Sequence, residues 1–337
     1  MQRNVRRLSS DFSPSSPRRL ARFADAAVRH AMRGIARAAL ARSTDARALS
    51  IPPGRRSRPT RFVELADDER VNVLGPSELV AIQTTDGYRT GVDAFALAWR
   101  ARARRDRLSR SSCVGESVAD LGAGSSGAVG LAYCSASPRT TRECVFFEKQ
   151  KASADRCARS VVANCVDFDA RVVEADCGDS DAARTWRGRF DVVLANPPFF
   201  ERSRGTPTSK SEEKMLGRFE STATIEDFCI FAREIMKPGV GEFFVVFPAH
   251  GRSRVVRAMR RVFGDGAVTV TECFDNPNAN EANLVFVRAS LSDDDVGSDA
   301  EEETCALHPK PREGGGQRAY AEPFSRFLRR VASAGEE

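Results

Sequence analysis

The chain has 337 residues, of which 41% are hydrophobic and 29% charged, and its formal net charge is +6. This length is sufficient for one large α/β domain with a sizeable buried core. No part of the sequence approaches the roughly 18 consecutive apolar residues that a membrane span needs, so we expect no membrane-spanning helix.

The cysteines and histidines do not form a metal-binding pattern. Nine cysteines are scattered along the chain without a C-x-x-C pair, and there are only three histidines. Zinc sites need four such ligands at regular spacings. We therefore expect reduced thiols and no metal site.

Residues 1–58 differ from the rest of the chain in composition. They contain 14 arginines and no lysine, against three acidic residues. From Arg19 to Arg42 apolar residues and arginines recur at helical spacing, which is typical of an organelle transit peptide. The alternatives are a disordered extension and a start codon placed too early. A transit peptide would direct the protein to a mitochondrion or plastid; without one we expect it in the cytoplasm.

Residues 59–337 have the composition of one folded domain in which short apolar runs alternate with helix-length stretches. Strands are expected at Ser117–Ala119, Cys144–Phe147, Arg171–Ala175, Phe190–Ala195, Glu242–Phe247, Ala267–Glu272 and Leu284–Val287, with helices at Lys151–Val166 and Thr224–Met236. This alternation predicts a single α/β catalytic domain with a Rossmann-like, doubly wound, seven-stranded and mostly parallel sheet. The last two strands are separated only by a short Asn-rich turn, so they are expected to form a C-terminal antiparallel hairpin.

Two segments near the C-terminus are expected to be mobile insertions. Residues 292–303 carry seven acidic residues and no base, and residues 311–317 are rich in glycine with a proline. Such polar, turn-rich segments bury too little apolar surface to pack.

The first chemical signal is a glycine-rich turn after the first predicted strand of the sheet. The strand ends in Asp120, and Gly122, Gly124 and Gly127 follow before a helix. Glycines allow a tight turn and close approach of a ligand to the helix N-terminus. The pattern fits a dinucleotide or S-adenosylmethionine equally well, and an ordinary βα turn remains the alternative.

Acidic residues follow the next two predicted strands. Glu148 is placed where an open α/β sheet binds ribose hydroxyls, and Asp176 could accept a hydrogen bond from an adenine amino group. A single acidic residue after a strand is more often a helix cap. Asp120, Glu148 and Asp176 stand at three consecutive strand ends, which favours a nucleoside site.

The signal that indicates the reaction is Asn196-Pro197-Pro198-Phe199, directly after the fourth strand. The two prolines stiffen the loop and leave carbonyl acceptors without backbone donors. The Asn196 side-chain oxygen and the Pro197 carbonyl can each accept one hydrogen of a planar –NH₂ group, and Phe199 can stack on the group that bears it. The motif therefore predicts methylation of a weakly nucleophilic amine without a strong base. A structural Pro-Pro turn is the alternative.

Together, these motifs resemble those of class I S-adenosylmethionine-dependent amino-methyltransferases of the N-P-P-[FY] group. The third glycine, Gly127, stands one residue later than in the usual G-x-G-x-G of that group. Upstream, Gln83–Ala98 (QTTDGYRTGVDAFALA) is similar to a stretch of the bacterial tRNA1(Val) adenine-37 N6-methyltransferase family. The resemblance implies that Tyr88, Arg89 and Asp93 flank the cofactor pocket, with Arg89 near the charged end of the cofactor.

By this resemblance S-adenosylmethionine is the cofactor. We expect it to be held by Arg89, Asp93, Asp120, Gly122, Gly124, Gly127, Glu148, Asp176 and Asn196, with Asn196, Pro197, Pro198 and Phe199 catalytic. The loop after the motif carries basic residues suited to RNA phosphates, namely Arg202, Arg204, Lys210, Lys214 and Arg218. A following helix carries arginines from Arg252 to Arg261, which more often form a solvated face than a binding surface.

The sequence analysis therefore predicts methyl transfer to the N6 amine of an adenine in RNA, with tRNA favoured over rRNA. Methylation of guanine N2 in rRNA or of a release-factor glutamine remains open. A non-catalytic RNA-binding subunit of the same fold is a further alternative. An NAD-dependent dehydrogenase would share the glycine-rich loop, but it would not explain the presence of Asn196-Pro197-Pro198-Phe199.

Overall fold

The computed structural model describes residues 47–49, 63–87, 89–107, 115–164, 166–201, 219–220, 223–292, 303–310 and 319–334. Tyr88, the basic residues from Arg202 to Arg218, nearly all of the N-terminal tail, residues 293–302 and residues 311–317 lie outside this description. None of the described helices is long and apolar enough to cross a membrane. Residues 48–337 form one compact unit, to which the following description applies.

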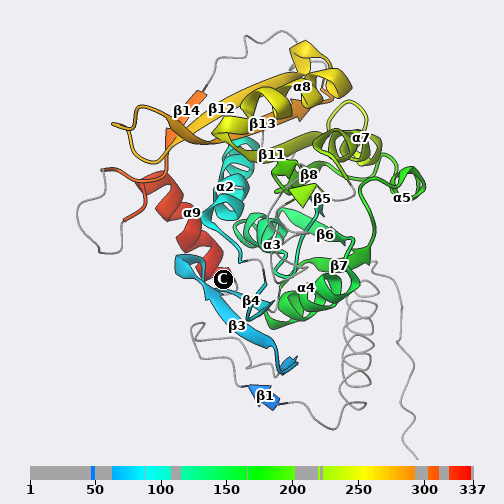
Figure 1. Ribbon diagram of the computed structural model, residues 1–337, viewed down its shortest axis with the longest axis vertical. Coiled ribbons are helices and arrows are strands. Elements are labelled where there is room, and N and C mark those ends of the chain that lie inside the picture. The colour runs from blue at the N-terminus through cyan, green and yellow to red at the C-terminus, as the bar shows by residue number, and fades with distance from the viewer. Residues whose placement is uncertain are drawn as a thin grey trace, which may run out of the picture. The chain divides into compact units, whose positions relative to one another are not determined.

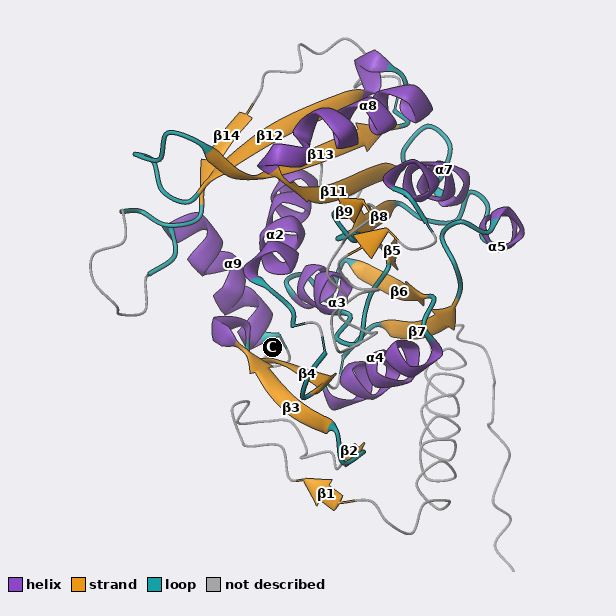
Figure 2. Ribbon diagram, viewed as in Figure 1, coloured by secondary structure: helices purple, strands orange, loops and turns teal. Residues whose placement is uncertain are grey.

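A central eight-stranded sheet has the strand order β14-β12-β13-β11-β8-β5-β6-β7 (Figures 1 and 2). Its strands are β5 (Glu116–Leu121), β6 (Thr141–Glu148), β7 (Asp169–Glu174), β8 (Val192–Ala195), β11 (Glu242–Pro248), β12 (Val268–Phe274), β13 (Ala282–Ser290) and β14 (Glu303–Ala306). Only β13 runs antiparallel to its neighbours. The predicted mostly parallel sheet with a C-terminal hairpin is confirmed. The sheet has eight strands rather than seven. The additional strand, β14, has only four residues and directly follows the acidic run, so no recognisable strand pattern marks it in the sequence.

Helices cover both faces of the sheet. One face carries α2 (Val92–Arg107), α3 (Ala128–Ser135), α4 (Lys151–Ala163) and α9 (Glu322–Ser333), and the other α5 (Ser180–Thr185), α7 (Ile225–Ile235) and α8 (Arg252–Phe263). Alternate strand residues enter the two cores: Val118 belongs to the first and Ala119 to the second. Double-sided burial explains why the inner strands β8 and β11 are mainly apolar.

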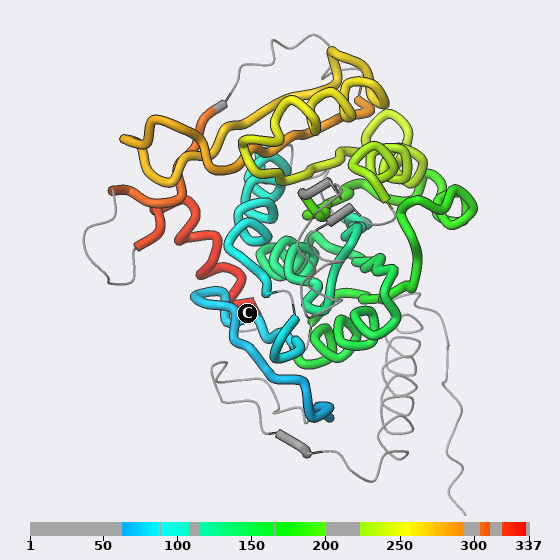
Figure 3. Tube along the Cα trace, in the orientation of Figure 1, coloured from blue at the N-terminus to red at the C-terminus, as the bar shows by residue number. Residues whose placement is uncertain are grey.

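The C-terminal helix α9 packs beside α2, although the two are far apart in the sequence (Figure 3). The rings of Trp99 and Phe324 join them, with 5.3 Å between centroids. Tyr320 packs edge-on against Phe324 and stacks on His308, at centroid distances of 5.0 Å each. The His308 ring, whose Nδ1 lies 2.8 Å from the Ala319 carbonyl, therefore helps to anchor the start of α9.

An N-terminal hairpin that the sequence analysis did not assign rests on α4. It consists of β3 (Glu69–Leu74) and β4 (Leu79–Thr84) and is antiparallel. The Asn164 side chain accepts from the Val80 N–H at 2.9 Å and donates to the Val80 carbonyl at 2.7 Å. Ser160 Oγ accepts from the Ile82 N–H at 2.9 Å. The side chains of Ser160 and Asn164 thus form hydrogen bonds with the outer side of the β4 backbone, where a neighbouring strand would otherwise do so.

Two further strand pairs and three 3-10 turns complete the described elements. They are the pair β1 (Arg47–Leu49) and β2 (Val63–Leu65), the parallel pair β9 (Phe200–Glu201) and β10 (Phe219–Glu220), and the 3-10 turns Gly75–Ser77, Ala249–Gly251 and Asp265–Ala267.

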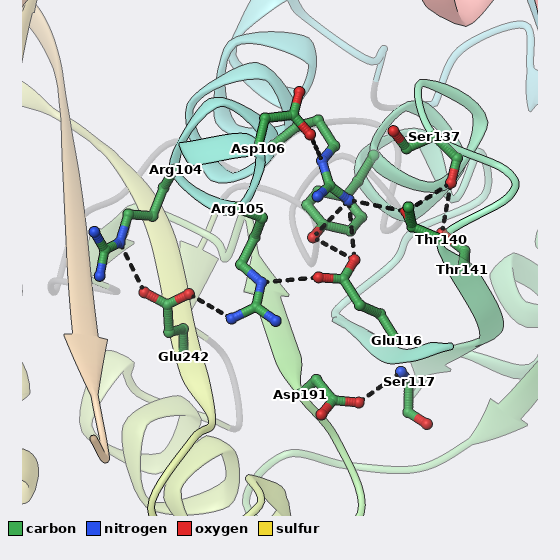
Figure 4. Close-up of polar contacts among 12 residues, drawn as sticks. Arg104, Arg105, Asp106, Glu116, Ser117, Ser137, Thr140, Thr141, Asp191 and Glu242 are labelled. Atoms are coloured by element: carbon green, nitrogen blue, oxygen red, sulfur yellow. Dashed lines mark hydrogen bonds and ion pairs between the residues drawn. The ribbon is translucent and has the colours of Figure 1, made fainter. Parts of the chain in front are cut away.

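A buried cluster of charges joins α2 to the amino ends of two strands (Figure 4). Glu116, at the start of β5, accepts from Arg102 at 2.9 Å and from Arg105 at 2.8 Å. Arg105 also reaches Glu242, at the start of β11, at 2.9 Å. The hydroxyl of Tyr133 on α3 donates to Glu116 at 3.0 Å.

The charges in this cluster stabilise one another. Burial alone would raise the pKa of Glu242, but the neighbouring charges of Arg288 and Arg105 outweigh it and lower that pKa. The same two guanidinium groups donate to Glu242 at 2.7 and 2.9 Å. Because the partners come from α2, β5, β11 and β13, the cluster determines the position of α2 along the sheet.

Replacing Glu116 by alanine would leave two buried guanidinium groups short of a carboxylate. We expect Glu116→Ala to lower the free energy of unfolding by about 3–5 kcal/mol, measured by urea denaturation at neutral pH. The control is Arg184→Ala, which removes an exposed pair with Asp181 on α5 and is expected to cost less than about 1 kcal/mol. Equal losses in the two variants would contradict a structural role for the cluster.

Candidate active site

The strand register brings the predicted site residues to one edge of the sheet. Leu121 pairs with both Ala195 and Phe147, so the residues that follow, Gly122, Asn196 and Glu148, are neighbours. Glu148 pairs in turn with Glu174, two residues before Asp176. Adjacent strands are about 4.8 Å apart. The four strand ends of β8, β5, β6 and β7 therefore form one continuous row.

The three glycines of the loop have different surroundings. All adopt positive φ angles: +67° at Gly122, +61° at Gly124 and +58° at Gly127. A Cβ at Gly127 would lie 3.0 Å from both the Phe146 ring and Cys157 Sγ, so the late third glycine permits close packing of α3. A Cβ at Gly124 would meet no described atom within 4 Å. The loop thus leaves open space beside Gly124.

The upstream segment contacts this loop through Thr90. The hydroxyl groups of Thr90 and Ser126 are 2.8 Å apart, and Ser160 Oγ donates to the Ser125 carbonyl at 3.1 Å. Arg89 is exposed. Its predicted contact with the cofactor stays a prediction.

Glu148 is buried and bound to the loop. Its Oε2 accepts from the Gly124 N–H at 2.9 Å, and its Oε1 accepts from the Gln150 N–H at 2.8 Å. The backbone thus holds the Glu148 carboxylate in place beside the glycine-rich loop.

Asp176 stands beyond Glu148, at the end of β7. Burial would raise its pKa, but the hydrogen bonds from the Lys149 ammonium, at 2.6 Å, and from the Gly178 N–H outweigh it and lower the pKa. Asp176 is therefore an ionised acceptor near neutral pH, which is compatible with its predicted contact with an adenine amino group.

Asp120 lies beneath the loop rather than at its surface. It is 1% exposed, and its Oδ2 accepts from the Gly130 N–H of α3 at 2.9 Å. Its Oδ1 has no hydrogen-bond partner among the described residues. Burial raises the pKa of Asp120 to about 7; the nearby charge of Glu148 adds to the rise, and the Gly130 N–H opposes it. In this position Asp120 supports the helix that follows the loop, and a direct contact with the cofactor stays a prediction.

The Asn196-Pro197-Pro198-Phe199 loop follows β8 directly. Asn196 Oδ1 is buried and has no hydrogen-bond partner among the described residues. The ring of Phe199 packs edge-on against Phe247 at a centroid distance of 5.3 Å. The loop thus contains an oxygen atom that can accept a hydrogen bond from a ligand, next to an aromatic ring that is held in place by Phe247.

Arg254 of α8 is a site residue that the sequence analysis did not single out. Its Nη2 donates to the Phe199 carbonyl, and its guanidinium lies 5.0 Å from the centre of the Phe247 ring. Other arginines of the same helix form ion pairs with acidic residues, such as Arg252 with Glu272 at 3.4 Å. No local signal in the sequence separates Arg254 from these neighbours.

The geometry fits S-adenosylmethionine. The open space beside Gly124 adjoins Glu148, whose carboxylate can hold a ribose, and Gly122 is the neighbour of Asn196 across the β5–β8 pair. Asn196 Oδ1 supplies an unpaired acceptor at the same edge. In the part of the chain that the structure describes, no three His, Cys, Asp or Glu side chains are grouped to hold a metal ion.

Comparison with known proteins agrees with this fit. Residues 106–273, which run from the end of α2 to β12, match the sequence model of the methyltransferase small domain. The protein is an S-adenosylmethionine-dependent methyltransferase. No curated protein matches the sequence.

Several solved structures are similar to the methyltransferase. A predicted O-methyltransferase from Agrobacterium tumefaciens has 22% identity and a TM-score of 0.49, and the match covers 72% of this chain and 97% of that one. TYW2 from M. jannaschii, in complex with AdoMet, has 12% identity and a TM-score of 0.42 over 68% of this chain and 89% of that one. TYW2 from P. horikoshii, in complex with MeSAdo, has 14% identity and a TM-score of 0.41 over 69% and 75%.

When bound, S-adenosylmethionine supplies the methyl group. In the methyltransferase, Glu148 can bind its ribose and the Gly122–Gly127 loop can approach its methionine part closely. Asn196 Oδ1 can accept a hydrogen bond from a donor group on the acceptor molecule. Phe247 and Arg254 hold Phe199 beside it.

The open space at Gly124 predicts a specific effect of a methyl group there. Gly124→Ala should weaken S-adenosylmethionine binding by at least about tenfold in titration calorimetry, because the added Cβ occupies space that a ligand can enter. It should also cost about 1–2 kcal/mol of stability, because alanine is strained at positive φ. Gly239→Ala is the matched control: Gly239 has φ +74° and no described atom near its Cβ position, but it precedes β11 at the opposite edge. The control should lose similar stability and no affinity, and equal affinities in the two variants would contradict the assignment.

The raised pKa of Asp120 predicts a pH dependence of stability. The folded protein binds this proton more tightly than the unfolded chain, so the contribution of Asp120 is most favourable below pH 4 and declines as the pH rises to about 7. Asp120→Asn should remove this decline, which can reach about 4 kcal/mol. Urea unfolding of both proteins at pH 5 and pH 8 tests this: the variant should gain stability relative to the wild type at pH 8. A pH-independent difference would contradict the assigned pKa.

Proposed function

We propose that the methyltransferase transfers a methyl group from S-adenosylmethionine to the exocyclic N6 amine of an adenine in RNA, most favourably in tRNA. The observation that carries the proposal is the buried Asn196 Oδ1, which has no partner among the described residues and lies at the carboxyl end of β8 beside the glycine-rich loop.

An exocyclic amine of a base has two hydrogens and a lone pair that is delocalised into the ring. Asn196 Oδ1 and the Pro197 carbonyl can accept these two hydrogens, which directs the lone pair toward the methyl donor. Proline at positions 197 and 198 ensures that no backbone N–H of these residues competes for the acceptors. Two oriented acceptors thus suit an –NH₂ group better than a hydroxyl group.

A base in RNA must leave its stack to reach this loop. Phe199 offers an aromatic surface for an unstacked base, and its packing against Phe247 keeps the ring in one orientation. Adenine in tRNA is favoured by the similarity of Gln83–Ala98 to the tRNA1(Val) adenine-37 N6-methyltransferase family. The basic residues between Arg202 and Arg218, outside the described part of the chain, would bind RNA phosphates.

The test is transfer of a labelled methyl group by the full chain. Unmodified total tRNA, rRNA, DNA and release factor are offered separately, and the labelled product is digested and identified. We expect N6-methyladenosine in tRNA, and a loss of about 10²–10³-fold in kcat for Asn196→Ala, the magnitude found when one oriented hydrogen-bonding group is removed from an active site.

The control is Arg184→Ala, whose exposed side chain on α5 pairs with Asp181, and it should retain full activity. Label in guanine N2 or in a glutamine amide would overturn the adenine assignment but keep amine methylation. Label that persists in Asn196→Ala would contradict the role of the loop.

A further inference from the structure

A carboxylate from a distant part of the chain contacts the key amide of the catalytic loop. Asp93 is the second residue of α2, whose start lies beside the glycine-rich loop, where the hydroxyl groups of Thr90 and Ser126 are 2.8 Å apart. Burial raises the pKa of the Asp93 carboxyl group, and a hydrogen bond from the Asn196 side chain partly offsets this rise. Asp93 Oδ1 also accepts from the Ala94 N–H at 3.0 Å. The Asp93 carboxylate is thus held by its own helix on one side and faces Asn196 on the other.

The chemistry of the two groups determines how the amide is turned. An ionised carboxylate only accepts hydrogen bonds, whereas a primary amide has a donor –NH₂ end and an acceptor oxygen end. The Asn196 –NH₂ must therefore face Asp93. The oxygen then points the other way, in agreement with Asn196 Oδ1 being the atom without a partner among the described residues.

The surroundings of Asp93 favour this arrangement. Burial raises the pKa of Asp93, and the hydrogen bonds from Ala94 and Asn196 oppose the rise, so the contact with Asn196 stabilises the ionised form. A Cβ at residue 91 would lie only 2.6 Å from Asp93 Oδ1, so Gly91 leaves the room that the carboxylate needs. The buried cluster around Arg102 and Arg105 holds the other half of the same helix.

We propose that Asp93 is a positioning residue that orients the Asn196 amide, so that its oxygen, and not its –NH₂, meets the acceptor molecule. With the opposite orientation the site would present N–H donors, which suit a carbonyl oxygen such as that of a keto base. Asp93 would thereby set the preference of the enzyme for an amine. The inference rests on the proposed amine methylation but holds whichever amine is the substrate.

An exchange of the two side chains tests the proposal. Asn196→Asp alone places two carboxylates face to face, so we expect kcat to fall by about 100-fold or more. Asp93→Asn alone provides a partner that can donate as well as accept, so the Asn196 amide is no longer held in one orientation and kcat should fall about tenfold. In the double variant the amide introduced at position 93 can donate to the carboxylate introduced at position 196, which still offers an acceptor oxygen to the amine. We expect the double variant to recover to within about tenfold of the wild type.

The readouts separate positioning from a structural role. For each variant, kcat and KM are measured on the amine substrate identified by the labelling assay, the Kd for S-adenosylmethionine by calorimetry, and stability by urea unfolding. We expect the changes in kcat with little change in cofactor Kd. Asp169→Asn, an exposed aspartate at the amino end of β7, is the matched control and should change neither quantity.

The outcomes distinguish the two proposals. If the wild type methylates an amine and the double variant is no more active than Asn196→Asp, the positioning role of Asp93 is wrong and the proposed function stands. A large change in cofactor Kd with unchanged kcat in Asp93→Asn would also overturn it, in favour of cofactor binding. If the wild type labels only oxygen or carbon atoms, or nothing at all, the proposed function fails and this inference fails with it.

Discussion

The buried ion cluster of Arg102, Arg105, Glu116 and Glu242 is the interaction on which the site depends. It joins α2 to the amino ends of β5 and β11, whereas the site lies at the carboxyl ends of the strands. A helix rises 1.5 Å per residue, so the twelve steps from Asp93 to Arg105 span about 18 Å along the sheet. Because the charges fix one end of α2, the Asp93 side chain near its other end also has a defined position.

The second constraint is the strand register. Because β8, β5, β6 and β7 end level with one another, Asn196, Gly122, Glu148 and Asp176 are neighbours although they are spread over about 75 residues of the sequence. Main-chain groups then hold the acidic side chains: Glu148 by Gly124 and Gln150, and Asp176 by Gly178. Few side chains are free to move, as is needed where a ligand must be held in one orientation.

Much of this arrangement could be predicted from local sequence signals. The alternation of apolar runs with helices indicated the sheet. Short motifs such as Asn196-Pro197-Pro198-Phe199 were placed after predicted strands, and the register brings those strand ends to one edge. Contacts between distant segments could not be predicted. Arg254 and Phe199 are 55 residues apart, and nothing in either neighbourhood indicates that a guanidinium holds that carbonyl. The contact of Asp93 with Asn196, and the burial of Asp120 beneath the loop, likewise depend on packing. The hairpin of β3 and β4 was missed because its main partner is a helix that begins 67 residues after β4 ends.

That hairpin has a consequence for the order in which the protein folds. Two strands alone are marginally stable in water, and β4 gains further hydrogen bonds from Ser160 of α4 and from Asn164 just beyond it. Helix α4 can present these side chains only once it has docked on the sheet, which requires β6 to be in place. During synthesis, the hairpin is therefore made early and becomes structured late. Its residues lack these partners until the part of the chain that supplies them has been produced.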